Sequence, residues 1–192
     1  MINLQRFFSK FPTIRLEDIT LRDLMLTDKQ EYFSMMSDPE VVKFLSDEDV
    51  PTTIEAAEDE IKFWGGLFYR KQSLFWAIAD SQTNKFMGTV GFNNWNFQNR
   101  RAEISYDLMR EFWGKGIMTK VLTNILIFGF QDMDLYRIEA RTMLENKASQ
   151  RVLEKAGFKH EGTQKGYRII RNEPTNVMLY GITKPDFSTF LA

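Results

Sequence analysis

The sequence predicts one α/β domain over residues 1–192, with a mixed, mostly antiparallel sheet of about six or seven strands and helices on both faces. Runs that alternate apolar and polar residues gather in the middle of the chain and near its end, which is typical of half-buried strands. Helix-start patterns precede the middle runs, and a long apolar segment introduced by two glycines follows them. No linker, repeat or low-complexity segment divides the chain.

The composition is that of a globular protein and excludes several kinds of site. Of the 192 residues, 43% are apolar and 27% are charged, and the net charge of −1 gives no basic field for nucleic acid or a membrane surface. The chain has no cysteine, which excludes disulfides, thiolate metal sites and a cysteine nucleophile, and fits the reducing cytoplasm. With His160 as the single histidine, a multi-histidine metal site is impossible, and we expect no metal. No apolar run has the length of a signal peptide or a membrane span.

The first third of the chain predicts one strand and three helices. Thr13 to Thr20 alternates apolar and polar residues, as a half-buried strand does. Thr27 and Gln30 have the spacing of a capping box, so a helix is expected from there to about Met36. Asp38-Pro39 starts a short helix, and Thr52-x-x-Glu55 opens a longer one that ends near Arg70.

The remaining elements are predicted from alternation, apolar runs and turn residues. Three strands should form an antiparallel meander, with a turn at Ser81 to Asn84 between the first two. The last two strands should form a closing hairpin through Asn172-Glu173-Pro174. The predicted elements are, in order, strands 74–79, 85–95 and 101–108, a helix at 117–130, a strand at 136–143, a helix at 146–156, and strands 158–171 and 175–183.

The segment from Leu108 to Phe130 combines a strand end, a Gly-x-Gly turn and a long helix. The first N–H groups of a helix lack intrahelical partners, the helix dipole adds positive charge there, and glycines allow a phosphate to approach the backbone. Lys115 in the turn adds a full charge. We therefore expect a phosphate or pyrophosphate here. Thr119 replaces the third glycine of the dinucleotide fingerprint, and a tight connection without any ligand is the alternative.

Two further patterns carry polar groups that could take part in chemistry. Glu103, Ser105 and Asp107 share one face of the strand 101–108, and a carboxylate there could serve as a general base if burial raised its pKa; a solvated strand face is the alternative. Ser149 shares a helical stripe with apolar residues, so its hydroxyl should point inward. The alternative is that Ser149 bonds locally and Asn146 is only an N-cap.

Taken together, motifs spread from Ile14 to Tyr180 resemble the GNAT superfamily of acetyltransferases, and within it the RimJ/RimL-type acetyltransferases of ribosomal-protein N-termini. The two most specific motifs are Glu111-Phe-Trp-Gly-Lys-Gly-Ile-Met-Thr119 and Asn146-Lys-Ala-Ser149. The other matching segments are Ile14-Arg-Leu, Ser37-Asp-Pro-Glu-Val41, Gly88-Thr-Val-Gly-Phe92, Ala102-Glu-Ile-Ser-Tyr106 and Leu153-Glu-Lys-Ala-Gly-Phe158.

The resemblance implies a GNAT fold and acetyl-CoA as cofactor, with CoA as product. It implies that the turn backbone binds the pyrophosphate, that the strand end pairs with the pantetheine arm, and that Asn146 and Ser149 lie beside the thioester. The full set of expected cofactor-binding residues is Leu108, Met109, Arg110, Trp113, Gly114, Lys115, Gly116, Ile117, Met118, Thr119, Asn146, Ser149, Arg151 and Lys155.

The expected reaction is acetyl transfer to a primary amine, directly in a ternary complex, because no cysteine could carry the acetyl group. Glu103 is the candidate base, and the sequence leaves open whether Glu103 or Asp107 is the better one. The backbone N–H of Met109 is the expected oxyanion donor, and Ser149 the expected donor to the leaving thiolate. Tyr106, on the opposite strand face, ranks lower.

The acceptor is expected to be a protein N-terminus or a small amine. A CoA-binding module without catalysis is the alternative function. We expect no nucleic acid and no membrane partner, and leave a homodimer open. Three residues depart from the family pattern: Glu111 and Lys120 near the turn, and Asn176 on the acceptor side. The acceptor side should be lined by helices between Thr27 and Arg70 and by the segment Gly91 to Asn99, with the aromatic side chains of Phe63, Trp64, Phe68, Trp95 and Phe97 in the core or at the acceptor.

Overall fold

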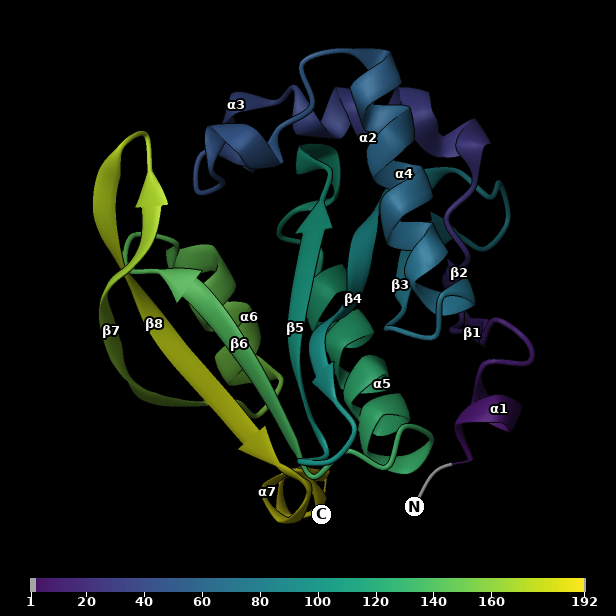
Figure 1. Ribbon diagram of the computed structural model, residues 1–192, viewed down its shortest axis with the longest axis vertical. Coiled ribbons are helices and arrows are strands. Elements are labelled where there is room, and N and C mark those ends of the chain that lie inside the picture. The colour runs from purple at the N-terminus through teal and green to yellow at the C-terminus, as the bar shows by residue number, and fades with distance from the viewer. Residues whose placement is uncertain (1–2, 192) are drawn as a thin grey trace. The chain divides into compact units, whose positions relative to one another are not determined.

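The computed structural model of the chain describes residues 3–191 (Figure 1). Its strands form an open sheet of eight in the order β1-β2-β3-β4-β5-β6-β8-β7, and helices flank this sheet. The predicted α/β class is confirmed, with eight strands in place of the expected six or seven. Contacts divide the chain into two compact units. We call them the N-terminal unit, Asn3–Asn93 with Tyr106–Trp113, and the C-terminal unit, Asn94–Ser105 with the chain from Gly114 onward.

The N-terminal unit holds the first four strands and the helices between them. Its strands β1 to β4 pair antiparallel in sequence order. The elements are α1 (Leu4–Phe7), β1 (Ile14–Arg15), β2 (Ile19–Arg22), α2 (Lys29–Met36), α3 (Pro39–Val42), α4 (Ile54–Tyr69), β3 (Phe75–Asp80) and most of β4 (Phe86–Asn96), with short 3-10 turns at Leu26–Asp28, Asp47–Asp49 and Arg110–Phe112.

The first predicted strand is wrong in one respect. Thr13 to Thr20 is not one strand but the start of a hairpin, in which β1 and β2 pair antiparallel and Leu16 N–H donates to the Ile19 carbonyl at 2.8 Å. The polar pair at 17–18 interrupts the alternation and forms the turn, because exposed polar residues favour a reversal over a buried strand.

Helix α4 begins one residue later than the capping pattern predicts. Thr53, not Thr52, is the N-cap, since its hydroxyl oxygen accepts the Ala56 N–H at 3.1 Å. The buried face of α4 packs on α2 and the sheet in one core cluster. The buried members of this cluster are Tyr32, Met35, Met36, Ala57, Ile61, Ala77 and Phe86.

The C-terminal unit is built around β6. Strand β6 (Arg137–Met143) pairs parallel with the first residues of β5 (Arg101–Leu108) and antiparallel with β8 (Glu173–Thr183), and β7 (Lys159–Ile170) completes a long hairpin with β8 (Figure 1). Helices α5 (Ile117–Gln131) and α6 (Lys147–Lys155) pack against β6. The parallel β5–β6 pair confirms the expected mixed sheet.

Two details of this unit differ from expectation. The hairpin turns at Arg171 and Asn172, both with positive φ (51° and 62°), and Pro174 already lies in β8. A last helix, α7 (Lys184–Leu191), follows β8, where the sequence pattern predicts none. Thr183 and Asp186 bond reciprocally at its start, the spacing of a capping box, so the signal was present in the sequence.

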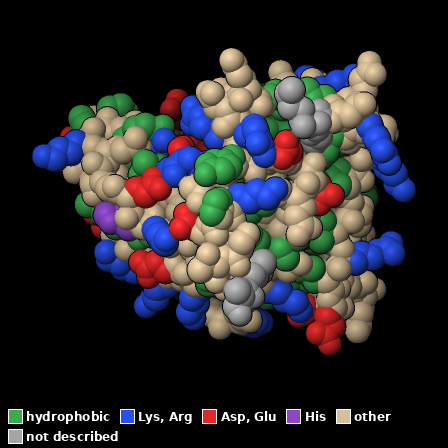
Figure 2. Space-filling view, turned by 90° about the horizontal axis from the view of Figure 1, so that it is seen from below, with side chains coloured by type: hydrophobic (Ala, Val, Ile, Leu, Met, Phe, Trp, Pro, Cys, Tyr) green, Lys and Arg blue, Asp and Glu red, His purple; other side chains and the backbone are tan. Residues whose placement is uncertain are grey.

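Charges are mixed on the surface. Figure 2 shows Lys and Arg side chains interspersed with Asp and Glu on one face, in keeping with the net charge of −1. Within residues 3–191, no helix has both the length and the apolar character needed to cross a bilayer.

Candidate functional site

The glycine turn before α5 has an open backbone. Gly114 and Gly116 adopt left-handed conformations, with φ of 73° and 76°. A Cβ built on either residue meets no atom within 4 Å, so the glycines are required by the backbone angle and not by crowding. The turn from Gly114 to Gly116 is exposed. A ligand can therefore approach these backbone groups closely.

The N-terminus of α5 carries no group that competes with an anion. Its N-cap is Gly116, which offers no side-chain acceptor, and the first turn contains no acidic residue. Met118 is 6% exposed and anchors this turn in the core, while Ile117 and Thr119 are half-buried. Because the first N–H groups of a helix point outward and the dipole is positive there, this end suits a phosphate.

In the N-terminal unit, two hydrogen bonds fix the backbone at the end of β5. The indole Nε1 of Trp113 donates to the Leu108 carbonyl at 2.7 Å, and Met109 N–H donates to the Met87 carbonyl at 2.9 Å. Met109 would have to exchange or share this bond before it could donate to an oxyanion, so that role stays a prediction. Arg110 is exposed.

Glu111 is not a free carboxylate. Its Oε1 lies 3.0 Å from the Lys85 ammonium, and the same ammonium lies 5.6 Å from the centre of the Phe112 ring. Both partners are about half exposed. The pair offsets the negative charge that the sequence places in the turn.

In the C-terminal unit, Asn146 is the N-cap of α6: its Oδ1 accepts the Ser149 N–H at 3.0 Å. Ser149 is half-buried, and Leu153 and Ala156 on its stripe are fully buried, as the periodicity predicts. The N-cap role uses the amide oxygen of Asn146, which leaves the amide NH₂ for another partner. Arg151 and Lys155 are exposed on the same helix.

Glu103 is held by two partners of its own unit. Its carboxylate lies 2.8 Å from Nη1 of Arg141 and accepts the Asn94 amide at 3.2 Å. Arg141 in turn donates to the Gln164 side chain at 2.8 Å and packs its guanidinium 4.8 Å from the Tyr167 ring centre. A proton acceptor in this position would have to leave or share an ion pair.

Asp107, two residues beyond Ser105 on the same strand face, is in the N-terminal unit and differs from Glu103. Burial raises its pKa to about 6, and the negative charges of Asp49 and Glu60 add to the shift, while a hydrogen bond with Thr89 opposes it. Glu60 itself accepts the buried Tyr32 hydroxyl at 2.6 Å, and burial raises the pKa of this carboxyl as well. A carboxylate that titrates near 6 suits a general base at neutral pH.

Sequence reasoning missed Arg141 and Thr89. Arg141 is 38 positions from Glu103 along the chain, and only the parallel register of β5 and β6 shows that they are near. Thr89 looks like an ordinary strand residue. Both contacts depend on strand pairing between distant segments, which no local pattern records.

The aromatic side chains expected on the acceptor side divide between core and surface. Phe68 is 1% exposed and Trp95 8%, so these two belong to the core. Phe63 and Phe97 are exposed, and the centre of the Trp64 ring lies 4.9 Å from the centre of the Phe63 ring.

Asn176, one of the departures from the family pattern, accepts the Gly166 N–H at 2.9 Å and so stabilises the β7–β8 hairpin. Among residues 3–191, no three His, Cys, Asp or Glu side chains are grouped to hold a metal ion.

Comparison with known proteins places this geometry in a family. Residues 18–159 match the family described as "Acetyltransferase (GNAT) domain". The chain is 31% identical to the "Uncharacterized N-acetyltransferase YoaA" of Bacillus subtilis, over 91% of this chain and 98% of that protein. It is 28% identical to the "[Ribosomal protein uS5]-alanine N-acetyltransferase" of Escherichia coli over 63% of each chain.

A solved structure shares the fold. RimL, a "Ribosomal L7/L12 alpha-N-protein acetyltransferase" determined in complex with coenzyme A, superposes with a TM-score of 0.81 at 20% identity, over 90% of this chain and 98% of that one. Because the family match covers well over half of the residues, the chain belongs to the GNAT family of acetyltransferases, with RimJ/RimL-like enzymes among its homologues.

Proposed function

We propose that the protein is an acetyl-CoA-dependent N-acetyltransferase that acetylates a primary amine at a protein N-terminus. The observation that carries the proposal is the open left-handed turn at Gly114–Gly116 leading into an α5 N-terminus without an acidic residue. These groups fit a pyrophosphate, since backbone N–H groups, the helix dipole and the nearby Lys115 all favour negative charge. Acetyl-CoA, when bound, supplies the acetyl group as a reactive thioester.

The residues proposed to hold CoA lie at the end of β5, on the turn before α5 and on α6. In the C-terminal unit, Gly114 through Thr119 would bind the pyrophosphate, and the free amide NH₂ of Asn146 is the group proposed to bond the pantetheine arm. Arg151 and Lys155 are proposed to reach the nucleotide end. In the N-terminal unit, Leu108 through Arg110 and Trp113 remain proposed contacts, with the Leu108 carbonyl already bonded to the indole.

For deprotonation of the acceptor amine, we favour Asp107 over Glu103. An amine must lose a proton before it can act as a nucleophile, and the pKa of Asp107, near 6, lets its carboxylate be ionised and still basic at pH 7. Glu103 remains the rival, but its carboxylate is occupied by Arg141. Ser149 and the Met109 N–H stay the proposed donors to the sulfur and to the carbonyl oxygen, respectively. With no cysteine in the chain, direct transfer is proposed.

The proposed acceptor class comes from a relative's name. The Escherichia coli relative is named for the alanine of ribosomal protein uS5, so a protein N-terminus is our first choice and a small amine the second. The chain is proposed to act in the cytoplasm, where such acceptors are made.

A thiol-release assay with three acceptors tests the proposal. We expect CoA release with a peptide that has a free N-terminal alanine, and none with the same peptide blocked at its N-terminus but carrying lysine. Release with a small amine alone would replace the proposed acceptor class. No release with any of the three, in a protein that binds CoA, would contradict catalysis and leave the binding-module function.

A further inference from the structure

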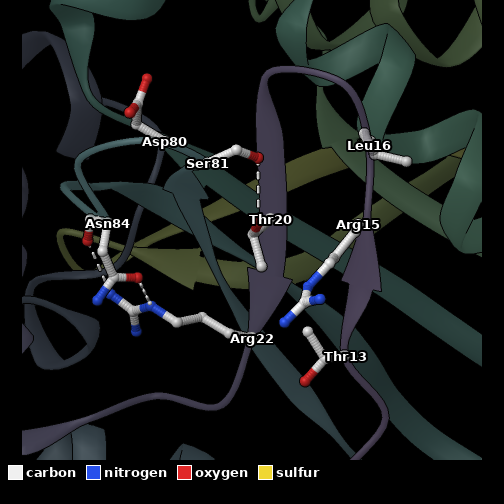
Figure 3. Close-up of a pocket in the computed structure, with 8 residues that line it drawn as sticks. All are labelled: Thr13, Arg15, Leu16, Thr20, Arg22, Asp80, Ser81 and Asn84. Atoms are coloured by element: carbon white, nitrogen blue, oxygen red, sulfur yellow. Dashed lines mark hydrogen bonds between the residues drawn. The ribbon is translucent and has the colours of Figure 1, made fainter.

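A polar pocket lies in the N-terminal unit, apart from the residues considered above. It is formed by β1, β2 and the turn between β3 and β4, and its volume is about 530 Å³ (Figure 3). Its lining residues are Thr13, Arg15, Leu16, Thr20, Arg22, Asp80, Ser81 and Asn84. Seven of these eight side chains are polar or charged, so the pocket suits a hydrophilic ligand.

Two of the three charged side chains in the lining, Arg22 and Asp80, already form hydrogen bonds within the protein. Arg22 forms a two-pronged pair with Asp28, with both N–O distances 2.8 Å, and donates to the Asn84 side chain at 2.7 Å. The carboxylate of Asp80 accepts N–H and O–H groups of its own turn from Gln82 and Thr83. These hydrogen bonds lower the pKa of Asp80, so it stays anionic at neutral pH.

Arg15 is the exception. Its side chain is exposed and has no hydrogen bond or ion pair with any residue of the described part of the chain. Figure 3 shows it pointing into the pocket, in the direction of Arg22. On the far wall, the hydroxyls of Thr20 and Ser81 bond each other at 3.0 Å, which leaves each with further hydrogen-bonding capacity. The pocket thus offers one guanidinium without a bonded partner among the described residues, together with hydroxyl groups and the turn carboxylate of Asp80.

We propose that this pocket binds a small, hydroxyl-bearing monocarboxylate, with its carboxylate on Arg15 and its hydroxyl groups on Thr20 and Ser81. A guanidinium forms paired hydrogen bonds with a carboxylate, which makes Arg15 the anchor. A single negative charge fits better than two, because the anionic Asp80 also lines the pocket and repels a dianion. The volume exceeds that of a bare anion, which leaves room for the hydroxyl-bearing part.

An NMR titration of the ¹⁵N-labelled protein tests the site. The probes are gluconate, its uncharged analogue sorbitol, and inorganic phosphate. We expect gluconate to shift the amide signals of Arg15, Thr20 and Ser81 saturably, sorbitol to leave them unchanged, and phosphate to bind more weakly than gluconate. Failure of gluconate to saturate these signals, or equal shifts with sorbitol, would overturn the site; tighter binding of phosphate would overturn the carboxylate assignment.

Matched variants assign the binding to the pocket. Arg15→Gln should weaken gluconate binding about tenfold, as loss of a charge-assisted bond predicts. Arg6→Gln removes the same charge from an exposed position of the same unit outside the lining, and should change nothing. Ser81→Ala should weaken binding severalfold. Equal affinity in the wild type and Arg15→Gln would refute the proposal, and acetyl transfer should be the same in all of these proteins.

Discussion

Nη1 of Arg141 lies 2.8 Å from Oε2 of Glu103, within the C-terminal unit. The pair joins β6 to β5 and holds the carboxylate that the sequence pattern favours as a base. Both side chains are largely buried, with 15% and 16% of their surface exposed, so the pair is shielded from solvent. The contact therefore favours a structural role for Glu103 and leaves Asp107 as the proposed base.

The first prediction separates the two carboxylates. Asp107→Asn should lower kcat about a hundredfold or more, because it removes the proton acceptor, and should leave CoA affinity unchanged. Glu103→Gln keeps the shape and should lower kcat less than tenfold. Steady-state kinetics with a peptide acceptor and CoA titration of both variants check this. The opposite order of losses would restore Glu103 as the base.

The second prediction concerns pH. A base works only when deprotonated, so kcat/KM should fall as pH drops through about 6, the pKa of Asp107. Asp107→Asn should remove this limb of the profile while a residual rate persists. A limb that survives unchanged in the variant would assign the titration to another group.

The third prediction concerns stability: because the pKa of Asp107 is raised by folding, the free energy of unfolding depends on pH. The pKa of Asp107 is higher in the folded protein, about 6, than in the unfolded chain, about 3.8, so the protonated carboxyl favours folding. This contribution to stability is fully present below pH 3.8 and is lost as the pH rises through about 6. Asp107→Asn should therefore stabilise the protein at pH 7, by about 1–3 kcal/mol. Urea unfolding at pH 7 and pH 4 measures it: the gain should shrink at pH 4. A variant that is less stable at pH 7 would show that the ionised carboxylate is well solvated.

The fourth prediction tests the turn before α5. Gly116→Ala forces an alanine to φ near 76°, which costs about 1–2 kcal/mol or shifts the backbone, so CoA affinity should fall about tenfold. Gly166→Ala is the matched control: φ there is 58°, in the β7–β8 hairpin, so the strain is similar and the turn is untouched. Equal loss of affinity in both variants would indicate general destabilisation.

The fifth prediction concerns Lys85 and Glu111. Lys85→Gln leaves the Glu111 charge unpaired and should weaken CoA binding up to about fivefold, the range of an exposed pair. Adding Glu111→Gln should restore the affinity. Calorimetry measures the CoA affinity of the two single variants and of the double variant, which together form a double-mutant cycle. A double variant that binds CoA as weakly as Lys85→Gln would assign the effect to Lys85 alone.

Much of the fold follows from local pattern, and the site only in part. Strand β5 has the predicted bounds, and α5 begins at Ile117 as expected, because alternation and a Gly-x-Gly turn are local signals. The alternation predicts one strand where β1 and β2 form a hairpin, and it predicts no helix at α7 although the capping residues of α7 are in the sequence. The glycine turn could be located from the residues, but the partners of Glu103, Asp107 and Glu111 could not. Those contacts depend on register between distant strands and on burial.

Calorimetric titration of the full chain with CoA tests the central claim most directly. The account predicts saturable binding to one site per chain in the micromolar range, weakened in Gly116→Ala and preserved in Gly166→Ala. No binding, in a protein whose unfolding transition shows it to be folded, would contradict the assignment of the turn at Gly114–Gly116 as the site of the pyrophosphate.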